Sequence, residues 1–164
     1  MIPSPIIHTT EDETIISDLY QHLLKSWNER DAAGFSSLFI EQSTVIGFDG
    51  SQMNGPDEIQ QSLEGIFKNH LTARYVWKIR EVRFLSPEVA VLKSVVGMVH
   101  PDHTDIDSSK NAVQSMVAMK HHSNWLITVF QNTPASFDGH PVLSMELTNE
   151  LQQVLNASKD PLLV

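Results

Sequence analysis

The chain has 164 residues, 41% of them hydrophobic, which is the usual size of one domain with a buried core. Its formal net charge is -9 at pH 7. Nucleic acids and anionic membranes require basic surfaces, so the charge argues against both as partners. The absence of cysteine excludes disulfide bonds, thiolate metal ligands and a cysteine nucleophile.

Helical periodicity dominates the first part of the chain. Thr10 and Glu13 have the spacing of a capping box, and apolar residues follow every three or four positions as far as Trp27. The elements expected up to the middle of the chain are an arm at 1–9, a helix from Thr10 to about Arg30, a short helix capped by Asp31 with Phe35, Leu38 and Phe39 on its apolar side, a strand at Thr44–Phe48, a turn at Asp49-Gly50, a return segment at Gln52–Asn54 and a helix from Pro56.

Long strands dominate the second part. The expected order is a strand at Thr72–Leu85, a strand at Val89–His100, a polar loop at Pro101–Lys110, a hairpin of Ala112–His121 and Trp125–Asn132, a helix near Pro141–Asn156 and a tail at 158–164. Helices followed by antiparallel strands predict a single α+β domain, with helices packed on one face of a curved sheet.

No segment has the pattern of secretion or of membrane insertion. The N-terminus lacks the basic and apolar regions of a signal peptide. The longest apolar stretch, Val89–Val99, contains Lys93 and Ser94 and is shorter than the ~20 residues of a membrane-spanning helix. The expected location is therefore the cytoplasm.

The hairpin at Ala112–Pro134 is apolar on both faces. Antiparallel strands with one solvated face alternate between apolar and polar residues, so we expect something to cover each face of this hairpin. A turn at Ser123-Asn124 predicts the pairs Lys120 with Ile127, Ala118 with Val129 and Met116 with Gln131 on one face, and Met119 with Thr128 and Val117 with Phe130 on the other.

Three amides, Gln114, Gln131 and Asn132, interrupt the aliphatic pattern of this hairpin. The predicted register places Gln114 and Gln131 on the side of Met116, where they could line one concavity. Buried amides need partners, so they either line a pocket and orient a neutral polar ligand or bond the backbone at the end of the sheet. Amides do not titrate, which favours binding over acid/base chemistry.

Two titratable residues are candidate catalytic bases. Asp49 lies at the expected pocket mouth, where a carboxylate can abstract a proton, although turn statistics favour an ordinary turn aspartate. His100 ends a predicted strand and either points into the pocket or has the structural role that is commoner for such a residue. Trp27, at the end of the buried stripe of the first helix, and Phe48, beside Asp49, complete the expected pocket lining.

The segment His100–Asp107 is rich in histidine and aspartate. It lacks the glycine and the terminal glutamate of a calcium loop and the ligand spacing of a zinc site. We expect a solvated acidic loop there, with no metal and no cofactor.

Several segments carry a family resemblance through their order along the chain. They are Trp27-Asn28-Glu29-Arg30-Asp31 with Phe35 and Leu38-Phe39, Phe48-Asp49-Gly50 with Gly55 and Ile59, Trp125-Leu126-Ile127, Phe130-Gln131-Asn132-Thr133-Pro134, and Leu147-Thr148-Asn149-Glu150-Leu151. Over residues of about 12–155 the chain resembles the nuclear-transport-factor-2-like (SnoaL-like) superfamily, and its last three segments resemble the SgcJ/EcaC-type subgroup. The resemblance implies a cone-shaped, mostly antiparallel sheet with helices on its concave face, a pocket inside the cone and a homodimer through the convex face.

The resemblance leaves the activity open, because this fold hosts many functions. Its isomerases pair an acid with a phenol or carboxyl group, and neither Tyr20 nor Tyr75 sits at a matching position. The leading hypothesis is a dimeric domain that binds a hydrophobic small molecule. The alternatives are an acid/base enzyme on a hydrophobic carbonyl substrate, with Asp49 or His100 as base, and a non-catalytic assembly module.

Overall fold

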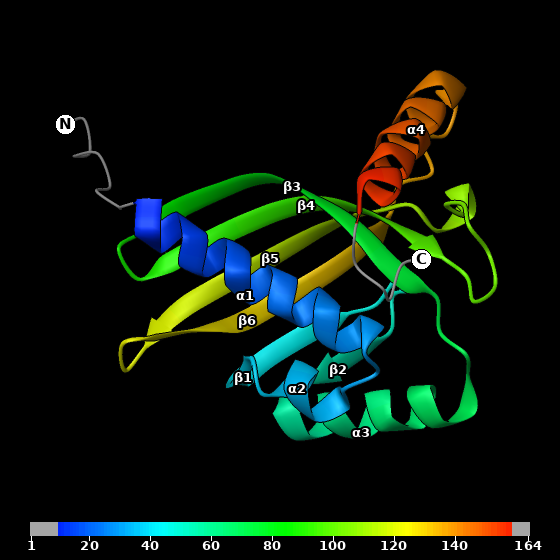
Figure 1. Ribbon diagram of the computed structural model, residues 1–164. Helices are drawn as coiled ribbons and strands as arrows, with labels where there is room; N and C mark the ends of the chain where they lie inside the picture. The colour runs from blue at the N-terminus through cyan, green and yellow to red at the C-terminus, as the bar shows by residue number, and fades with distance from the viewer. Residues whose placement is uncertain (1–9, 159–164) are drawn as a thin grey trace.

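Six strands form one curved, open sheet in the order β2-β1-β6-β5-β4-β3 (Figure 1). The computed structural model describes residues 10–158, so the arm expected at 1–9 and all but the first residue of the expected tail lie outside the described residues. Neighbouring strands are antiparallel except β1 and β6, which are parallel. The predicted α+β fold is confirmed. The strands are β1 (Phe39–Ile46), β2 (Gln52–Asn54), β3 (Arg74–Ser86), β4 (Val89–Val99), β5 (Ala112–His121) and β6 (Asn124–Pro134).

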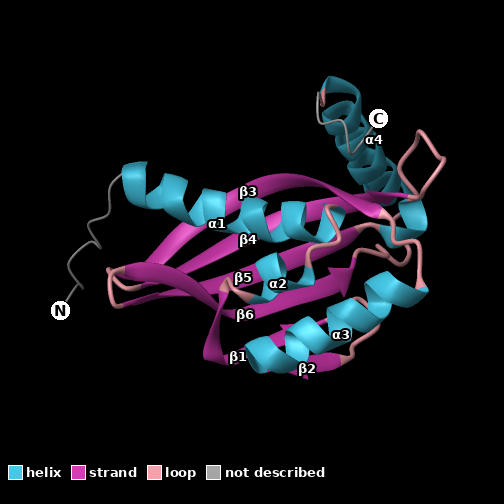
Figure 2. Ribbon diagram, turned by 60° about the horizontal axis from the view of Figure 1, so that its bottom comes forward, coloured by secondary structure: helices cyan, strands magenta, loops and turns pink. Residues whose placement is uncertain are grey.

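Three helices cover the concave face of the sheet: α1 (Thr10–Asn28), α2 (Ala32–Ser36) and α3 (Gly55–Asn69) (Figure 2). Asp31 caps α2 as expected, because its Oδ1 accepts the Gly34 N–H at 2.9 Å. Phe39 begins β1 instead of extending α2, so this strand starts earlier than predicted. No helix within residues 10–158 is long and apolar enough to cross a membrane.

A fourth helix, α4 (Pro141–Ala157), packs on the opposite face of the sheet. Side chains alternate along a strand, so Tyr75 belongs to the core under α1 while Val76 contacts the α4 cluster. Glu150 of α4 accepts hydrogen bonds from Arg80 and Lys78 of β3, which lower its pKa to about 2. This second cluster joins Val76, Val95, Val99, Ile106, Leu147, Leu151 and Leu155.

The loop between β4 and β5 is fastened to α4. Ile106 is buried, and its N–H donates to Gln152 Oε1 at 2.9 Å. At the other end of the loop, Asn111 Nδ2 donates to Thr148 Oγ1 at 2.8 Å. The expectation of a solvated loop therefore holds for exposed residues such as Asp102 but is wrong for Ile106.

The register of the β5–β6 hairpin differs from the prediction. The turn residues are His122 and Ser123, with φ of 49° and 69°, rather than Ser123 and Asn124. Positive φ at both central positions is typical of a type I′ hairpin turn, and asparagine usually adopts it more readily than histidine. A bulge after Val117 then adds a residue to β6, so that Met116 faces Phe130 rather than Gln131. The pairs found are Lys120 with Trp125, Met119 with Leu126, Ala118 with Ile127, Val117 with Val129 and Gln114 with Asn132.

Gly97 of β4 is where the α4 cluster approaches the sheet most closely. A methyl group there would lie 3.0 Å from Ile106 Cγ2 and 3.1 Å from Leu151 Cδ1. Both neighbours belong to a packed cluster, so we expect Gly97→Ala to lower the free energy of unfolding in urea by about 1–3 kcal/mol. Gly65→Ala in α3 is the control, because a methyl group there meets nothing within 4 Å, and it should raise stability by about 0.5–1 kcal/mol. Equal effects of the two substitutions would contradict this packing.

Candidate functional site

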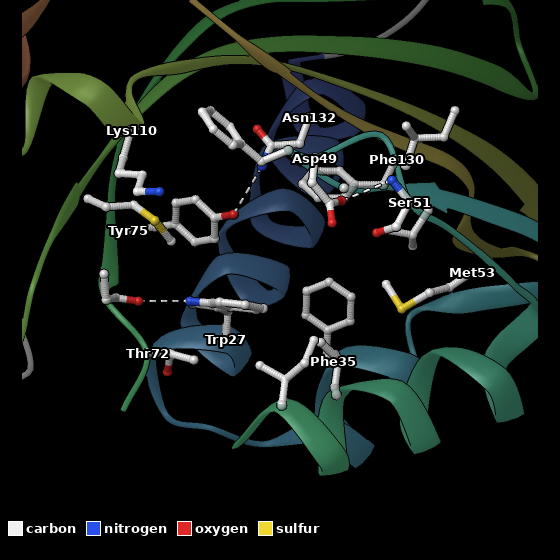
Figure 3. A pocket seen from close by; sticks show the side chains of 18 of the residues that line it. Trp27, Phe35, Asp49, Ser51, Met53, Thr72, Tyr75, Lys110, Phe130 and Asn132 are labelled. Carbon is white, nitrogen blue, oxygen red and sulfur yellow. Dashed lines mark hydrogen bonds between the residues drawn. The ribbon is translucent and has the colours of Figure 1, made fainter. Parts of the chain in front are cut away.

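A pocket of about 430 Å³ lies between the three concave-face helices and the sheet (Figure 3). Its walls are mostly apolar and come from the sheet and from the three helices on its concave face. Trp27 is supplied by α1, Phe35 by α2 and Phe130 by β6. The remaining lining residues are Val45, Ile46, Gly47, Phe48, Asp49, Ser51, Met53, Leu63, Ile66, Leu71, Thr72, Ala73, Tyr75, Met98, His100, Lys110 and Asn132.

Trp27 is fixed in the pocket wall by its indole. Its Nε1 donates to the Ala73 carbonyl at 2.9 Å, and its ring meets the Phe67 ring edge-on at a centroid distance of 5.3 Å. The second contact uses the aromatic quadrupole, which favours edge-to-face pairs. These two contacts fix the orientation of the Trp27 side chain in the pocket wall without a ligand.

Arg30 holds the loop between α3 and β3 at the pocket rim. Its guanidinium donates to Thr72 Oγ1 at 3.0 Å, to the His70 carbonyl at 2.9 Å and to the Phe67 carbonyl. This loop presents Leu71, which lines the pocket although 83% of its surface is exposed. A large apolar side chain left open beside an apolar cavity is a surface that a ligand would cover.

The deepest polar feature is a chain of four buried side chains that connects α1 to the pocket. Tyr20 donates its O–H to Gln114 Oε1 at 2.6 Å, and Gln114 Nε2 donates to Asn132 Oδ1 at 3.4 Å. Asn132 Nδ2 then donates to the Tyr75 hydroxyl oxygen at 3.3 Å. Only Asn132 and Tyr75 reach the pocket.

Burial keeps both phenols of this chain neutral. It raises the pKa of Tyr75 to about 12 and the pKa of Tyr20 further, because a phenolate would lose its hydration in the core. Asn132 uses one of its two amide N–H groups on Tyr75. The polar floor of the pocket therefore offers neutral hydrogen-bonding groups at pH 7.

Asp49 lies in the pocket lining, in the turn after β1. Its Oδ1 accepts the Ser51 N–H at 2.9 Å, which is the geometry of an Asx turn. Hydrogen bonds from the Ser51 side chain and backbone hold the pKa of this fully exposed carboxyl below its usual value. A carboxylate stabilised in this way is a weak base, so the geometry favours the ordinary turn aspartate.

His100 lies at the pocket mouth and is paired with a residue that the sequence did not single out. Its Nε2 is 2.6 Å from Asp107 Oδ2. Hydrogen bonds from Ser109 and then from His100 lower the pKa of Asp107 to about 2, so the carboxylate is ionised and orients the imidazole. Lys110 completes the mouth, with its Nζ 5.6 Å from the centre of the Phe48 ring.

The structure places the sequence-selected residues in three groups. Trp27, Phe48, Asp49, His100 and Asn132 lie in the pocket lining. Gln114 and Met116 are fully buried beneath it and are not part of the lining.

Gln131 forms the third group, because it lies neither in the lining nor beneath it. It is exposed on the outer face of the sheet, because the one-residue register change beyond the bulge exchanges the two faces of a strand. Its expected place on the side of Gln114 and Met116 is therefore wrong.

Within residues 10–158, no cluster of three histidine, aspartate or glutamate side chains could hold a metal ion.

The sequence analysis did not select three residues of the candidate site. Tyr75 is one of the inward side chains of β3, but that strand's periodicity alone gave no reason to prefer a pocket to the core. Asp107 and Lys110 lie in a loop whose path depends on α4, a helix far along the chain. The close spacing of His100 and Asp107 was the only available signal.

Comparison with known proteins supports the fold alone. No protein-family model matches the sequence, and no curated protein matches it. A cystatin-like domain of unknown function from Nostoc punctiforme is similar over 92% of this chain and 100% of its own, with 23% identity and a TM-score of 0.75.

Two further solved structures carry names that mention enzymes. A ketosteroid isomerase-like protein from Erwinia carotovora has 16% identity and a TM-score of 0.61 over 78% of this chain and 99% of its own. A protein proposed to be a scytalone dehydratase, from Novosphingobium aromaticivorans, has 17% identity and a TM-score of 0.64 over 76% of this chain and 84% of its own. The chain thus has the cystatin-like fold of the nuclear-transport-factor-2-like proteins, while the SgcJ/EcaC-type subgroup stays a prediction.

The buried polar chain can be tested by a double-mutant cycle on urea unfolding. Tyr20→Phe should lower the free energy of unfolding by about 1–3 kcal/mol, because it leaves the buried Gln114 Oε1 without its hydrogen-bond donor. Gln114→Leu should cost about 2–3 kcal/mol, because it strands the Tyr20 hydroxyl and weakens the support of Asn132. The double variant should cost less than the two single costs together, with a coupling of about 0.5–2 kcal/mol. Strict additivity would show that these side chains do not act as one network.

Proposed function

We propose that the protein binds a small, largely apolar molecule in the concave-face pocket and does so without catalysing a reaction. The supporting observation is the combination of aromatic walls with a neutral polar floor. Trp27, Phe35 and Phe130 enclose a cavity of about 430 Å³, and Tyr75 with Asn132 form its floor. Cavities of this size and composition are typical of small-molecule sites.

The driving force for binding would be the removal of apolar surface from water. Each Å² of apolar surface that is buried contributes about 25 cal/mol, so the exposed Leu71 and the pocket walls favour an aromatic or aliphatic body. A carbonyl or hydroxyl group on that body could meet the Asn132 amide at the floor. Because this floor does not titrate near pH 7, it orients a ligand rather than transferring protons.

An acid/base enzyme is the second candidate, and the His100–Asp107 pair is the observation that favours it. A histidine held by an ionised aspartate at the edge of a pocket is the arrangement of a general base. Asp49 is a weaker candidate for the general base than His100, because hydrogen bonds from Ser51 already stabilise its carboxylate form and lower its pKa. Turnover of an apolar carbonyl compound that His100→Asn abolishes, with ligand binding retained, would establish this function instead of pure binding.

Binding can be tested with phenylnaphthylamine, a neutral aromatic probe whose fluorescence rises in apolar surroundings. We expect saturable binding of one probe per chain. Ser51→Trp places a large ring in the pocket mouth while leaving the Ser51 backbone bond to Asp49 intact, so it should weaken binding at least about tenfold.

The matched control for this experiment is Ser136→Trp, an equal change at an exposed position outside this pocket. It should leave the affinity for the probe within about twofold of the unsubstituted protein. Binding that is unsaturable, or that both tryptophan variants reduce equally, would rule out the proposed site.

We also propose that two copies of the chain pair through the outer face of β4, β5 and β6. Apolar residues continue across these strands in register, with Val91 beside Val117 and Val117 beside Val129. A second row joins Val89, Met119 and Leu126, and Met119 is 39% exposed. Contiguous apolar surface on a sheet face commonly marks a protein interface.

Dimerisation can be measured by light scattering at micromolar concentration. The expected mass is twice 18.4 kDa, and Val117→Lys should give a monomer because it places a charge at the centre of the patch. Val142→Lys is the matched control, since Val142 is 58% exposed on α4 and outside the patch. A monomeric unsubstituted protein would refute the proposed interface.

A further inference from the structure

Lys110 is the lysine of the pocket lining, and it has no charged partner among the described residues. Within the described part of the chain, no carboxylate lies at ion-pair distance from its Nζ. Its one recorded side-chain contact is with the Phe48 ring, at 5.6 Å from the ring centre. An ammonium beside an apolar cavity can accept an anionic partner from outside the chain.

The two carboxylates close to the mouth are already engaged. Asp49 accepts the Ser51 N–H, and Asp107 is bound by His100 and by the Ser109 N–H and hydroxyl. These contacts hold the pKa of both carboxyls below its usual value, so they stay ionised without Lys110. The remaining basic side chain near the rim, Arg30, is directed at backbone carbonyls and at Thr72.

The position of Lys110 is set by the fold rather than by a free loop. It ends the short 3-10 turn Ser108–Lys110, in which Asp107 Oδ1 accepts the Ser109 N–H. The loop on either side is bonded to Gln152 and Thr148 of α4. A cation held in place loses less conformational entropy when it binds a ligand.

The negative charge of the whole protein means that an anionic ligand would depend on a local contact with Lys110. A chain with net charge -9 repels small anions at long range. An anion that nevertheless binds must gain from a local contact with the ammonium of Lys110, which is exposed beside the half-buried Phe48 ring. A ligand body in the pocket would bring its own charged end to the mouth.

We propose that the ligand is an amphipathic monoanion, with an aromatic or aliphatic body inside the pocket and a carboxylate or sulfonate group bound by Lys110 at the mouth. This inference rests on the proposed binding function and adds the chemical class of the ligand. Lys110 is the residue that determines specificity for the charged group, while the aromatic walls supply affinity for any body of suitable shape.

Two probes with the same aromatic body separate the two claims. Anilinonaphthalene sulfonate carries an anionic group, and phenylnaphthylamine has none. We expect the unsubstituted protein to bind the sulfonate at least about fivefold more tightly, with an advantage that shrinks at high salt because salt screens the charge contact. Lys110→Met should remove this advantage and leave the affinity for the neutral probe within about twofold.

Two controls make the result specific to Lys110. Lys120→Met makes the same change in net charge at an exposed position near the hairpin tip and should change neither affinity. Lys110→Arg keeps the charge and should retain most of the preference for the sulfonate.

The outcomes distinguish the two proposals. Equal affinities for the two probes in the unsubstituted protein, or a sulfonate preference that survives Lys110→Met, overturn the anionic ligand while the pocket proposal stands. The absence of saturable binding by either probe, or indifference of both to Ser51→Trp, overturns the pocket proposal and with it this inference.

Discussion

The pocket depends on the pairing of the polar groups beneath it. Tyr20, Gln114, Asn132 and Tyr75 bring polar atoms into a largely apolar core. Burial without partners would cost each of them about 1–3 kcal/mol. The cost is avoided only when α1, β3, β5 and β6 keep one relative position. That position leaves the space between Trp27 and Phe130 open, so the same constraint that orders the core also shapes the cavity.

The architecture followed from patterns that act locally. The helix periodicity from Ile16 to Trp27, the Asp31 cap and the long strands with short turns predicted the elements and the α+β class. The register of the β5–β6 hairpin could not be predicted from these patterns. It depends on positive φ at His122 and Ser123 and on a bulge between Val117 and Ala118. Neither has a strong sequence signal, and a one-residue error was enough to place Gln131 on the wrong face.

The candidate site was predictable only in part for a related reason. Trp27, Phe48 and Asn132 stand at the ends of elements, where a change of residue type is visible in the sequence. Lys110 and Asp107 are positioned by contacts with α4, which lies on the other side of the sheet and is separated by two strands along the chain. Long-range anchoring of this kind leaves no local pattern. The acidic loop is largely solvent-exposed, as expected, and it also carries Lys110 at the pocket mouth.

A crystal structure of the protein with phenylnaphthylamine tests the central claim most directly. The account predicts that the probe's rings lie between Trp27, Phe35 and Phe130, above the Tyr75 and Asn132 floor, with the four-residue polar chain unchanged. A cavity closed by the protein's own side chains, or a probe found only on the outer face of the sheet, would contradict it.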